Sequence, residues 1–328
     1  MRTSARLASI AALAGLATPV AAAQQQHALP ALGAVDSTTQ AEDVAIKNDG
    51  YERMTVPVVV SDTGPYQFLV DTGADRSAVS KALADRLQLR RSAPVRLHSV
   101  AGVSAVQTAA LPSLRLTSSN ISVDGAAVLS DDHMGADGIL GVDSLRSQRV
   151  EFDFKANLMS VVPAAQITRF EVPDPSEIVV TAKRKSGRLV IANAKVDSEL
   201  VRAVLDTGSQ ITIGNEALRR KLMRTRGIAE RGGKVEIRSV TGERLIGEYL
   251  MLSRLEIGGA ILSNVAIVFA DAHTFKQLGL DRRPAMLLGM NAMRAFDKVS
   301  IDFANKKLRL IPPQHSDSQQ TQLASRLP

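Results

Sequence analysis

The chain reads as a series of short apolar runs separated by glycine, proline, asparagine and aspartate. Two examples, Val56 to Val60 and Tyr66 to Val70, flank the turn dipeptide Gly64-Pro65. Runs of this length, alternating or fully apolar, are typical of β-strands, and the residues between them are typical of turns. Helical patterns are few and follow Ser80 and Asn215, which are both good N-cap residues. The pattern predicts an all-β protein with little helix.

The same pattern occurs twice along the chain. Residues 68–87 (FLVDTGADRSAVSKALADRL) align with residues 203–222 (AVLDTGSQITIGNEALRRKL), 135 positions later. Further pairs of segments align in the same order at somewhat larger spacings: 95–102 with 235–242, 138–145 with 286–293, and 149–163 with 298–313. A repeat this long is too large for a solenoid unit. We therefore expect two homologous β-rich lobes, at 51–163 and 188–313, each with one short helix.

The remaining segments surround these lobes. Residues 24–50 are polar and lack periodicity, so we expect a flexible leader, and residues 314–328 have the composition of a disordered tail. Residues 164–187 contain Pro173 and Pro175 and are interpreted as a linker. The β-branched stretch from Glu177 to Ala182 could add an edge strand.

The first 23 residues have the pattern of a secretory signal peptide. Arg2 and Arg6 precede an apolar run from Leu7 to Val20, and Ala21-Ala22-Ala23 supplies a small-residue cleavage site. An uncleaved membrane anchor is the alternative, but the run is short for a membrane span. We therefore expect an exported protein, periplasmic or secreted, with no membrane span after cleavage.

Composition excludes several kinds of chemistry. The 328 residues include no cysteine, so disulfides, thiol nucleophiles and cysteine-bound metals are excluded. The five histidines are widely separated, and Asp131-Asp132-His133 is interpreted as a solvated turn, so no metal and no cofactor are expected. The net charge of +7 comes from interspersed acids and bases, and aromatic residues make up only 3%. A nucleic-acid partner is therefore not expected.

The tripeptide Asp-Thr-Gly occurs three times, and the repeat separates the copies. Those at Asp71 and Asp206 align at the 135-residue spacing, whereas the same spacing carries Asp62 to Asp197, where no Asp-Thr-Gly follows. Asp62 is therefore interpreted as part of a hairpin turn. Two facing carboxylates, one from each lobe, would share one proton, so that one can activate water while the other polarises a carbonyl. The sequence thus predicts an acid dyad of Asp71 and Asp206.

These motifs resemble those of the retroviral-type (retropepsin-like) aspartic proteases: two apolar residues, Asp-Thr-Gly and a small residue, then, further on, two apolar residues and glycine. The resemblance covers roughly 51–163 and 188–313 and implies a single-chain pseudo-dimer that hydrolyses peptide bonds. It implies strands at 139–141 and 287–289 beneath the active-site loops, and flap hairpins that close over a peptide. The implied loop residues are Thr72, Gly73, Ala74, Thr207, Gly208 and Ser209, and the implied substrate-binding residues are Asp75, Gln210, Ala101, Gly102, Thr241 and Gly242.

The chain departs from the family pattern in two respects. The arginine that family members carry after the later glycine is missing from both lobes, and Gln210 stands where the first lobe has the acid Asp75. The sequence therefore lacks a complete ion-pair network of the usual kind. The second lobe also has Ser209 after its Asp-Thr-Gly. We expect the Ser209 hydroxyl to donate to Asp206 and lower its pKa, which leaves the shared proton more often on Asp71.

These features together predict an aspartic endopeptidase that acts as a monomer, with a peptide or protein as its substrate. The alternative is a non-catalytic peptide-binding module that has kept the cleft of the protease fold, because a fold alone does not establish activity.

Overall fold

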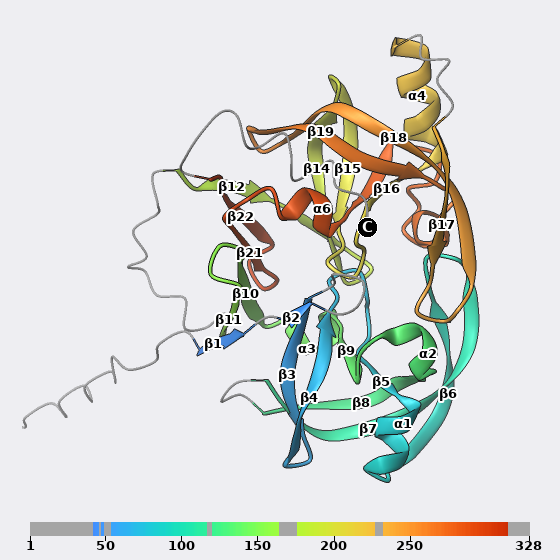
Figure 1. Ribbon diagram of the computed structural model, residues 1–328, viewed down its shortest axis with the longest axis vertical. Helices are drawn as coiled ribbons and strands as arrows, with labels where there is room; N and C mark the ends of the chain where they lie inside the picture. The colour runs from blue at the N-terminus through green and yellow to red at the C-terminus, as the bar shows by residue number, and fades with distance from the viewer. Residues whose placement is uncertain are drawn as a thin grey trace, which may run out of the picture. The chain divides into compact units, whose positions relative to one another are not determined.

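Figure 1 shows the protein as a computed structural model that describes residues 42–45, 47–48, 54–116, 120–163, 176–226 and 232–313. The predicted signal peptide, the predicted tail and most of the predicted leader lie outside the described residues. Within the described residues the strands form three sheets, one for each lobe and a third that contains strands of both. The prediction of an all-β, two-lobed protein is confirmed.

The first lobe is an eight-stranded sheet with the strand order β2-β3-β4-β9-β5-β8-β7-β6. Its apolar runs alternate where one face is exposed and are buried throughout where both faces are covered, as in β5 and β9. The strands are β2 (Lys47–Asn48), β3 (Met54–Val60), β4 (Thr63–Val70), β5 (Ala78–Ser80), β6 (Arg91–His98), β7 (Val103–Arg115), β8 (Asn120–Leu129) and β9 (Gly138–Leu140), and the helices are α1 (Lys81–Arg86), α2 (Asp131–Met134) and α3 (Val142–Leu145).

The second lobe repeats this sheet, in the strand order β13-β14-β15-β20-β16-β19-β18-β17. Each strand occupies the place of its counterpart in the first lobe, which is what the sequence repeat predicts. The strands are β13 (Lys183–Lys185), β14 (Arg188–Val196), β15 (Glu199–Leu205), β16 (Thr212–Gly214), β17 (Lys234–Arg238), β18 (Arg244–Ile257), β19 (Ala260–Phe269) and β20 (Ala285–Leu288), and the helices are α4 (Glu216–Arg226), α5 (His273–Gln277) and α6 (Met290–Met293).

The prediction of one helix per lobe is wrong, because each lobe has three among its described residues. Only α1 and α4 correspond to the predicted helices. The other four are helical turns of four or five residues. Segments of that length are too short to show a helical period in the sequence.

The third sheet joins the two lobes, in the order β1-β11-β10-β21-β22-β12. Strand β10 of the first lobe pairs antiparallel with β21 of the second, with Val150 opposite Ile301 and Phe152 opposite Val299. All four side chains are fully buried. The lobes are therefore connected by a continuous hydrogen-bonded ladder as well as by the chain. The strands are β1 (Glu42–Ala45), β10 (Gln148–Asp153), β11 (Leu158–Pro163), β12 (Ile178–Thr181), β21 (Lys298–Asp302) and β22 (Lys307–Ile311).

Two strands at the edges of this third sheet revise the repeat boundaries. Strand β12 confirms the predicted edge strand in the linker. Strand β1 pairs with β11 in the equivalent place at the other edge, and β2 pairs with β3, so the prediction of a flexible leader is wrong for these strands. Strands of two and four residues carry no recognisable period, and their pairing with a neighbour defines them. The repeat therefore begins with β1 in one lobe and with β12 in the other.

Parallel strand pairs hold the two predicted active-site loops in place. Strand β4 pairs with β9 and β15 pairs with β20, and each aspartate follows directly. The backbone N–H of Asp71 donates to Leu140 O at 3.0 Å, and that of Asp206 donates to Leu288 O at 3.1 Å. The apolar strands predicted beneath the loops therefore do lie beside them.

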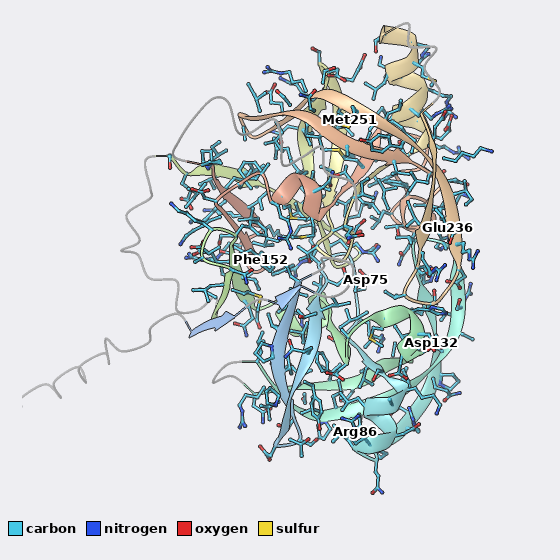
Figure 2. All side chains as sticks on the ribbon, in the orientation of Figure 1. Asp75, Arg86, Asp132, Phe152, Glu236 and Met251 are labelled. Atoms are coloured by element: carbon cyan, nitrogen blue, oxygen red, sulfur yellow. The ribbon has the colours of Figure 1, made fainter. Side chains whose placement is uncertain are left out.

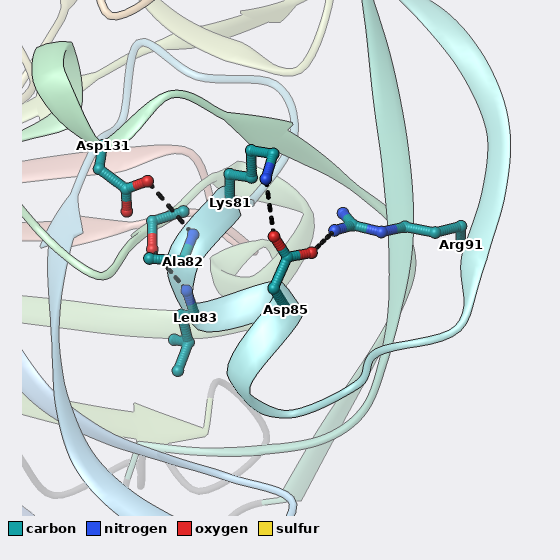
Figure 3. Close-up of polar contacts among 7 residues, drawn as sticks. Lys81, Ala82, Leu83, Asp85, Arg91 and Asp131 are labelled. Carbon is teal, nitrogen blue, oxygen red and sulfur yellow. Dashed lines mark hydrogen bonds and ion pairs between the residues drawn. The ribbon is translucent and has the colours of Figure 1, made fainter.

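The two predicted N-caps are confirmed. The Ser80 hydroxyl accepts the Leu83 N–H at 3.1 Å, and Asn215 Oδ1 accepts the Leu218 N–H at 2.9 Å. Figure 3 shows that the first turn of α1 is held a second time, because Asp131 Oδ2 accepts the N–H of Ala82 at 3.2 Å. The same view shows Asp85 of α1 bound to Lys81 and to Arg91.

The Asp-Thr-Gly at Asp62 forms a turn, as predicted. Ser61 and Asp62 both have positive φ angles, 48° and 61°, between β3 and β4, and the Asp62 side chain is 84% exposed. Asp197 and Ser198 adopt the same conformation between β14 and β15. A two-residue turn of this kind matches the twist of a β-hairpin. Asp62 is exposed to solvent and does not line the candidate site.

Candidate active site

The loops after β4 and β15 bring Asp71 and Asp206 together across the boundary between the lobes. A methyl group added at Gly73 would lie 2.5 Å from Asp206 Oδ1, and one added at Gly208 would overlap the Asp71 carboxylate. Each carboxylate therefore packs against the glycine of the opposite loop, at a distance that excludes a side chain there. Neighbouring strands in each lobe thus place the two predicted catalytic residues face to face.

Two threonines lock these loops to each other. The N–H of Thr72 donates to Thr207 Oγ1 at 3.0 Å, and the N–H of Thr207 donates to Thr72 Oγ1 at 3.1 Å. The Thr207 hydroxyl in turn donates to Val70 O at 2.6 Å. Both threonines are buried. Buried reciprocal hydrogen bonds fix the spacing of the loops, because breaking either one leaves a polar group unpaired.

Burial and mutual repulsion place the shared proton on Asp206. The side chain of Asp206 is buried, and this burial, with the nearby charge of Asp71, raises the pKa of Asp206 to about 7. Asp71 is only half-buried, and its Oδ1 accepts the N–H groups of Gly73 at 2.8 Å and Ala74 at 3.0 Å. Two N–H donors favour an ionised carboxylate. Asp206 also accepts backbone N–H groups, but their effect is smaller than that of its burial.

The prediction that Ser209 makes Asp206 the more acidic member is therefore wrong. The Ser209 hydroxyl donates to Ile211 O at 2.7 Å, within its own loop. It stabilises that turn, and the greater burial of Asp206 decides which carboxyl holds the proton.

A buried arginine that the sequence analysis missed links the two lobes beside the dyad. Arg188, at the start of β14, is 3% exposed, and its Nε lies 3.5 Å from Asp75 Oδ1. Its Nε donates to Gly73 O, and its Nη1 donates to Gln277 Oε1 at 3.1 Å. Gln277 Nε2 then donates to Asp75 Oδ2 at 3.3 Å. Burial raises the pKa of Asp75, and the Arg188 charge opposes that rise.

Arg188 supplies a cation where the later motifs lack one. In the two apolar-apolar-glycine motifs, Asp143 and Asn291 each bind a backbone N–H group of their own lobe. Asp143 Oδ1 accepts the N–H of Ser77 at 2.9 Å, and Asn291 Oδ1 accepts the N–H of Thr212 at 2.9 Å. In the sequence Arg188 stands at the start of β14, the strand before β15, and this position does not indicate that its partners Gly73 and Asp75 lie in the other lobe.

A cleft of about 720 Å³ opens above the dyad. Of the predicted residues, the cleft is lined by Asp71, Gly73, Ala74, Asp75, Asp206, Gly208, Ser209 and Gln210. Thr72 and Thr207 lie beneath it. The predicted flap residues Ala101, Gly102, Thr241 and Gly242 are at the hairpin turns, and the flap surface of the cleft is formed instead by 96–100 and 235–240. Figure 2 labels Asp75 on a loop and Glu236 on β17, which both line this cleft.

The flap hairpins, β6–β7 and β17–β18, contact each other above the cleft. The Ser104 hydroxyl of the first flap donates to Glu243 of the second, and Glu243 also accepts the Ser239 hydroxyl at 2.7 Å and the Thr241 hydroxyl. Partial burial acts to raise the pKa of Glu243, but the three hydroxyl donors outweigh it and lower the pKa to about 2. Glu243 therefore stays ionised in mildly acidic solution.

Each flap also rests on a helix of the opposite lobe. Val100 O accepts the N–H of His273, and the rings of His98 and His273 stack with Nδ1 and Nε2 3.0 Å apart. On the other side, a methyl group at Gly242 would lie 2.6 Å from the His133 ring. His133 also lines the cleft and belongs to α2, so the interpretation of residues 131–133 as a solvated turn is wrong for it. His133 and His273 are 140 residues apart, which is also the spacing of the two flap segments. This shared spacing is the feature of the sequence that links the two histidines to the flaps.

The described residues contain no group of three or more histidine, aspartate or glutamate side chains suited to hold a metal ion. In the same part of the chain, none of the helices has the length and apolar character needed to cross a membrane.

Comparison with protein families finds a match in both lobes. The family model described as "Aspartyl protease" matches residues 56–144 and 192–292, which is more than half of the chain. Each matched segment contains one aspartate of the dyad, one flap hairpin and one of the strands beside the active-site loops. Among curated proteins, no significant match is found.

Proposed function

Because the chain belongs to the aspartyl protease family, with two retropepsin-like lobes, we propose that it is an endopeptidase whose lobes each supply one catalytic carboxylate. The observation that carries the proposal is the packing of Asp71 and Asp206 against the glycine of the opposite loop, beneath a cleft that both flaps cover. Carboxylates in this arrangement share a proton, which is the state that general acid–base hydrolysis requires.

The mechanism follows from the position of the proton. Asp71 is ionised and takes a proton from a water molecule held between the carboxylates, while protonated Asp206 donates to the oxygen of the scissile carbonyl. The oxygen of the water bonds to the carbonyl carbon and forms a tetrahedral diol. Transfer of the proton now on Asp71 to the peptide nitrogen then breaks the C–N bond. Asp206 regains its proton from the diol, and the dyad returns to its starting state.

A peptide would bind in extended form between the loops and the flaps. Strand-like pairing supplies sequence-independent affinity in such a cleft, and the side chains of the peptide alternate between its two walls. Closure of the flaps excludes bulk water, which strengthens the electrostatic effect of the dyad on the carbonyl.

The experiment that tests the proposal replaces each catalytic aspartate by asparagine. We expect Asp71→Asn and Asp206→Asn each to lower cleavage of a casein or peptide-library substrate by at least about a thousandfold, since asparagine can neither take nor share the proton. The control is Asp62→Asn, which changes the same residue of the same tripeptide at the exposed β3–β4 turn. It should leave cleavage unchanged.

The same variants distinguish the alternative of a peptide-binding module. If the wild-type protein binds peptides but cleaves none of them between pH 3 and 8, the cleft is a binding site without catalysis. Retention of cleavage in Asp71→Asn would also contradict the proposal, provided that both variants keep the circular dichroism spectrum of the wild type.

A further inference from the structure

The two walls of the cleft differ in charge although the lobes share one fold. Arg76 and Ile211 each stand five residues after the catalytic aspartate of their lobe, and both line the cleft. Their equivalence is structural as well, because the next residues, Ser77 and Thr212, are held by side chains of α3 and α6 in the same way. The first wall therefore carries a guanidinium where the second carries an apolar side chain.

The flaps extend this difference. In the aligned flap segments Arg96 of β6 corresponds to Glu236 of β17, and both line the cleft. Glu236 is paired with Arg238 at 3.3 Å and with Arg244 at 3.4 Å. Arg96, in contrast, has no ion pair within the part of the chain that the structure describes. Arg238, which also lines the cleft, is therefore engaged by a carboxylate of its own flap, whereas Arg96 is not.

Arg76 is held in place by groups that do not cancel its charge. Its Nη1 donates to Gly125 O at 2.7 Å and to Asp124 O at 3.5 Å, and both acceptors are backbone carbonyls. The nearest acid in sequence, Asp75, is already engaged by Arg188 and Gln277. Carbonyl contacts orient a guanidinium and leave its remaining N–H groups available for a carboxylate, which Arg binds in fork geometry.

We infer that the cleft selects peptides with Asp or Glu on the side lined by Arg76 and Arg96, and with an apolar side chain on the pseudo-equivalent side lined by Ile211. The unequal walls also give the peptide one preferred direction through a pseudo-symmetric cleft, because reversal would place the carboxylate against Ile211 and the Glu236 pair. The selection of cleaved peptides rests on the proposed protease function. The selection of bound peptides does not depend on cleavage and can be tested by itself.

The test measures peptide binding with full-length Asp71→Asn protein, so that cleavage does not interfere. Labelled peptides carry Asp or Glu, or the uncharged Asn or Gln, at each position in turn, and anisotropy gives the dissociation constants. We expect one position at which the acid binds about tenfold more tightly than its amide, since hydrogen bonds to charged groups are stronger than neutral ones. Discrimination should shrink as salt is raised.

The Arg76→Gln and Arg96→Gln variants should each reduce this discrimination, and Arg76→Glu should reverse it, so that the amide peptide binds more tightly than the acid. Arg76 and Arg96 are exposed, so the variants are expected to fold. The matched control is Arg115→Gln, which removes the same charge from the same lobe at a position paired with Asp62 outside the cleft. All of these variants are made in the Asp71→Asn protein. Equal discrimination in that parent and in its Arg76→Gln and Arg96→Gln variants, or an equal loss in Arg115→Gln, would overturn the inference.

Failure of the proposed function gives a different result. A protein that discriminates acids from amides in binding but cleaves no peptide would contradict the protease proposal and support the charge selection. A protein that binds and cleaves acidic and amide peptides equally well would support the protease proposal and contradict the charge selection.

Discussion

Arg188 lies close enough to Asp206 for its positive charge to lower that pKa, against the burial and the Asp71 charge that raise it to about 7. The singly protonated dyad is the form that catalyses hydrolysis, and it is lost when Asp206 ionises. For the wild type we therefore expect kcat/KM to fall about tenfold per pH unit above pH 7.

Removal of the guanidinium should move this alkaline limb. Without the Arg188 charge the pKa of Asp206 rises, so Arg188→Gln should retain activity to higher pH than the wild type, even if its maximal rate is lower. The measurement is kcat/KM against pH, with thermal unfolding to show that the variant is folded. Ser209→Ala is the control and should leave the limb in place, because that hydroxyl donates to Ile211 O. A limb that moves in Ser209→Ala but not in Arg188→Gln would contradict this assignment.

At the scale of the elements, a carboxylate of the second flap binds the first flap. Glu243 accepts hydroxyls from both hairpins. Glu243→Gln keeps the size of the side chain but replaces charged acceptors by a neutral one, which should weaken the contact by roughly 1–3 kcal/mol. We expect faster amide hydrogen exchange in residues 95–106 and 234–250 and a KM several times higher. Glu256→Gln is the control, since Glu256 lies on β18 in ion pairs with Lys195 and Arg254. Unchanged exchange in Glu243→Gln would show that other contacts hold the flaps.

The elements also show where sequence reasoning succeeds. Asp71, Asp206 and the strands beside them could be predicted because each appears twice in one register, and a repeated motif is hard to produce by chance. Strand β1 could not, since four residues at a sheet edge have no pattern of their own. Arg188 and His133 could not be assigned to the site because their partners lie in the other lobe, and no local pattern encodes that packing. The Ser209 prediction failed because a hydroxyl has several acceptors within reach, and the turn geometry selects among them.

At the scale of the whole chain, the two lobes share one hydrophobic core. A single cluster of buried side chains includes Val56 and Leu140 of the first lobe, Leu205 and Leu288 of the second, and Phe152 in the joining sheet. A separate cluster around Phe275 belongs mainly to the second lobe. Such continuity predicts that the lobes unfold together, with the joining sheet as the part whose loss affects both.

Replacement of Phe152 tests this continuity. Phe152 is fully buried on β10, between Met159 of β11 and Val299 of β21. Phe152→Ala should lower the free energy of unfolding by about 3–5 kcal/mol, because the sheet cannot close over the space left. Amide exchange should then accelerate in β4 and β15 alike. Phe275→Ala makes the same substitution in the second lobe's own cluster and should accelerate exchange mainly in β15 and β20. If Phe152→Ala affected only β4, the lobes would be folding independently, and the alignment of Asp71 with Asp206 would depend on the threonine, arginine and flap contacts between the lobes.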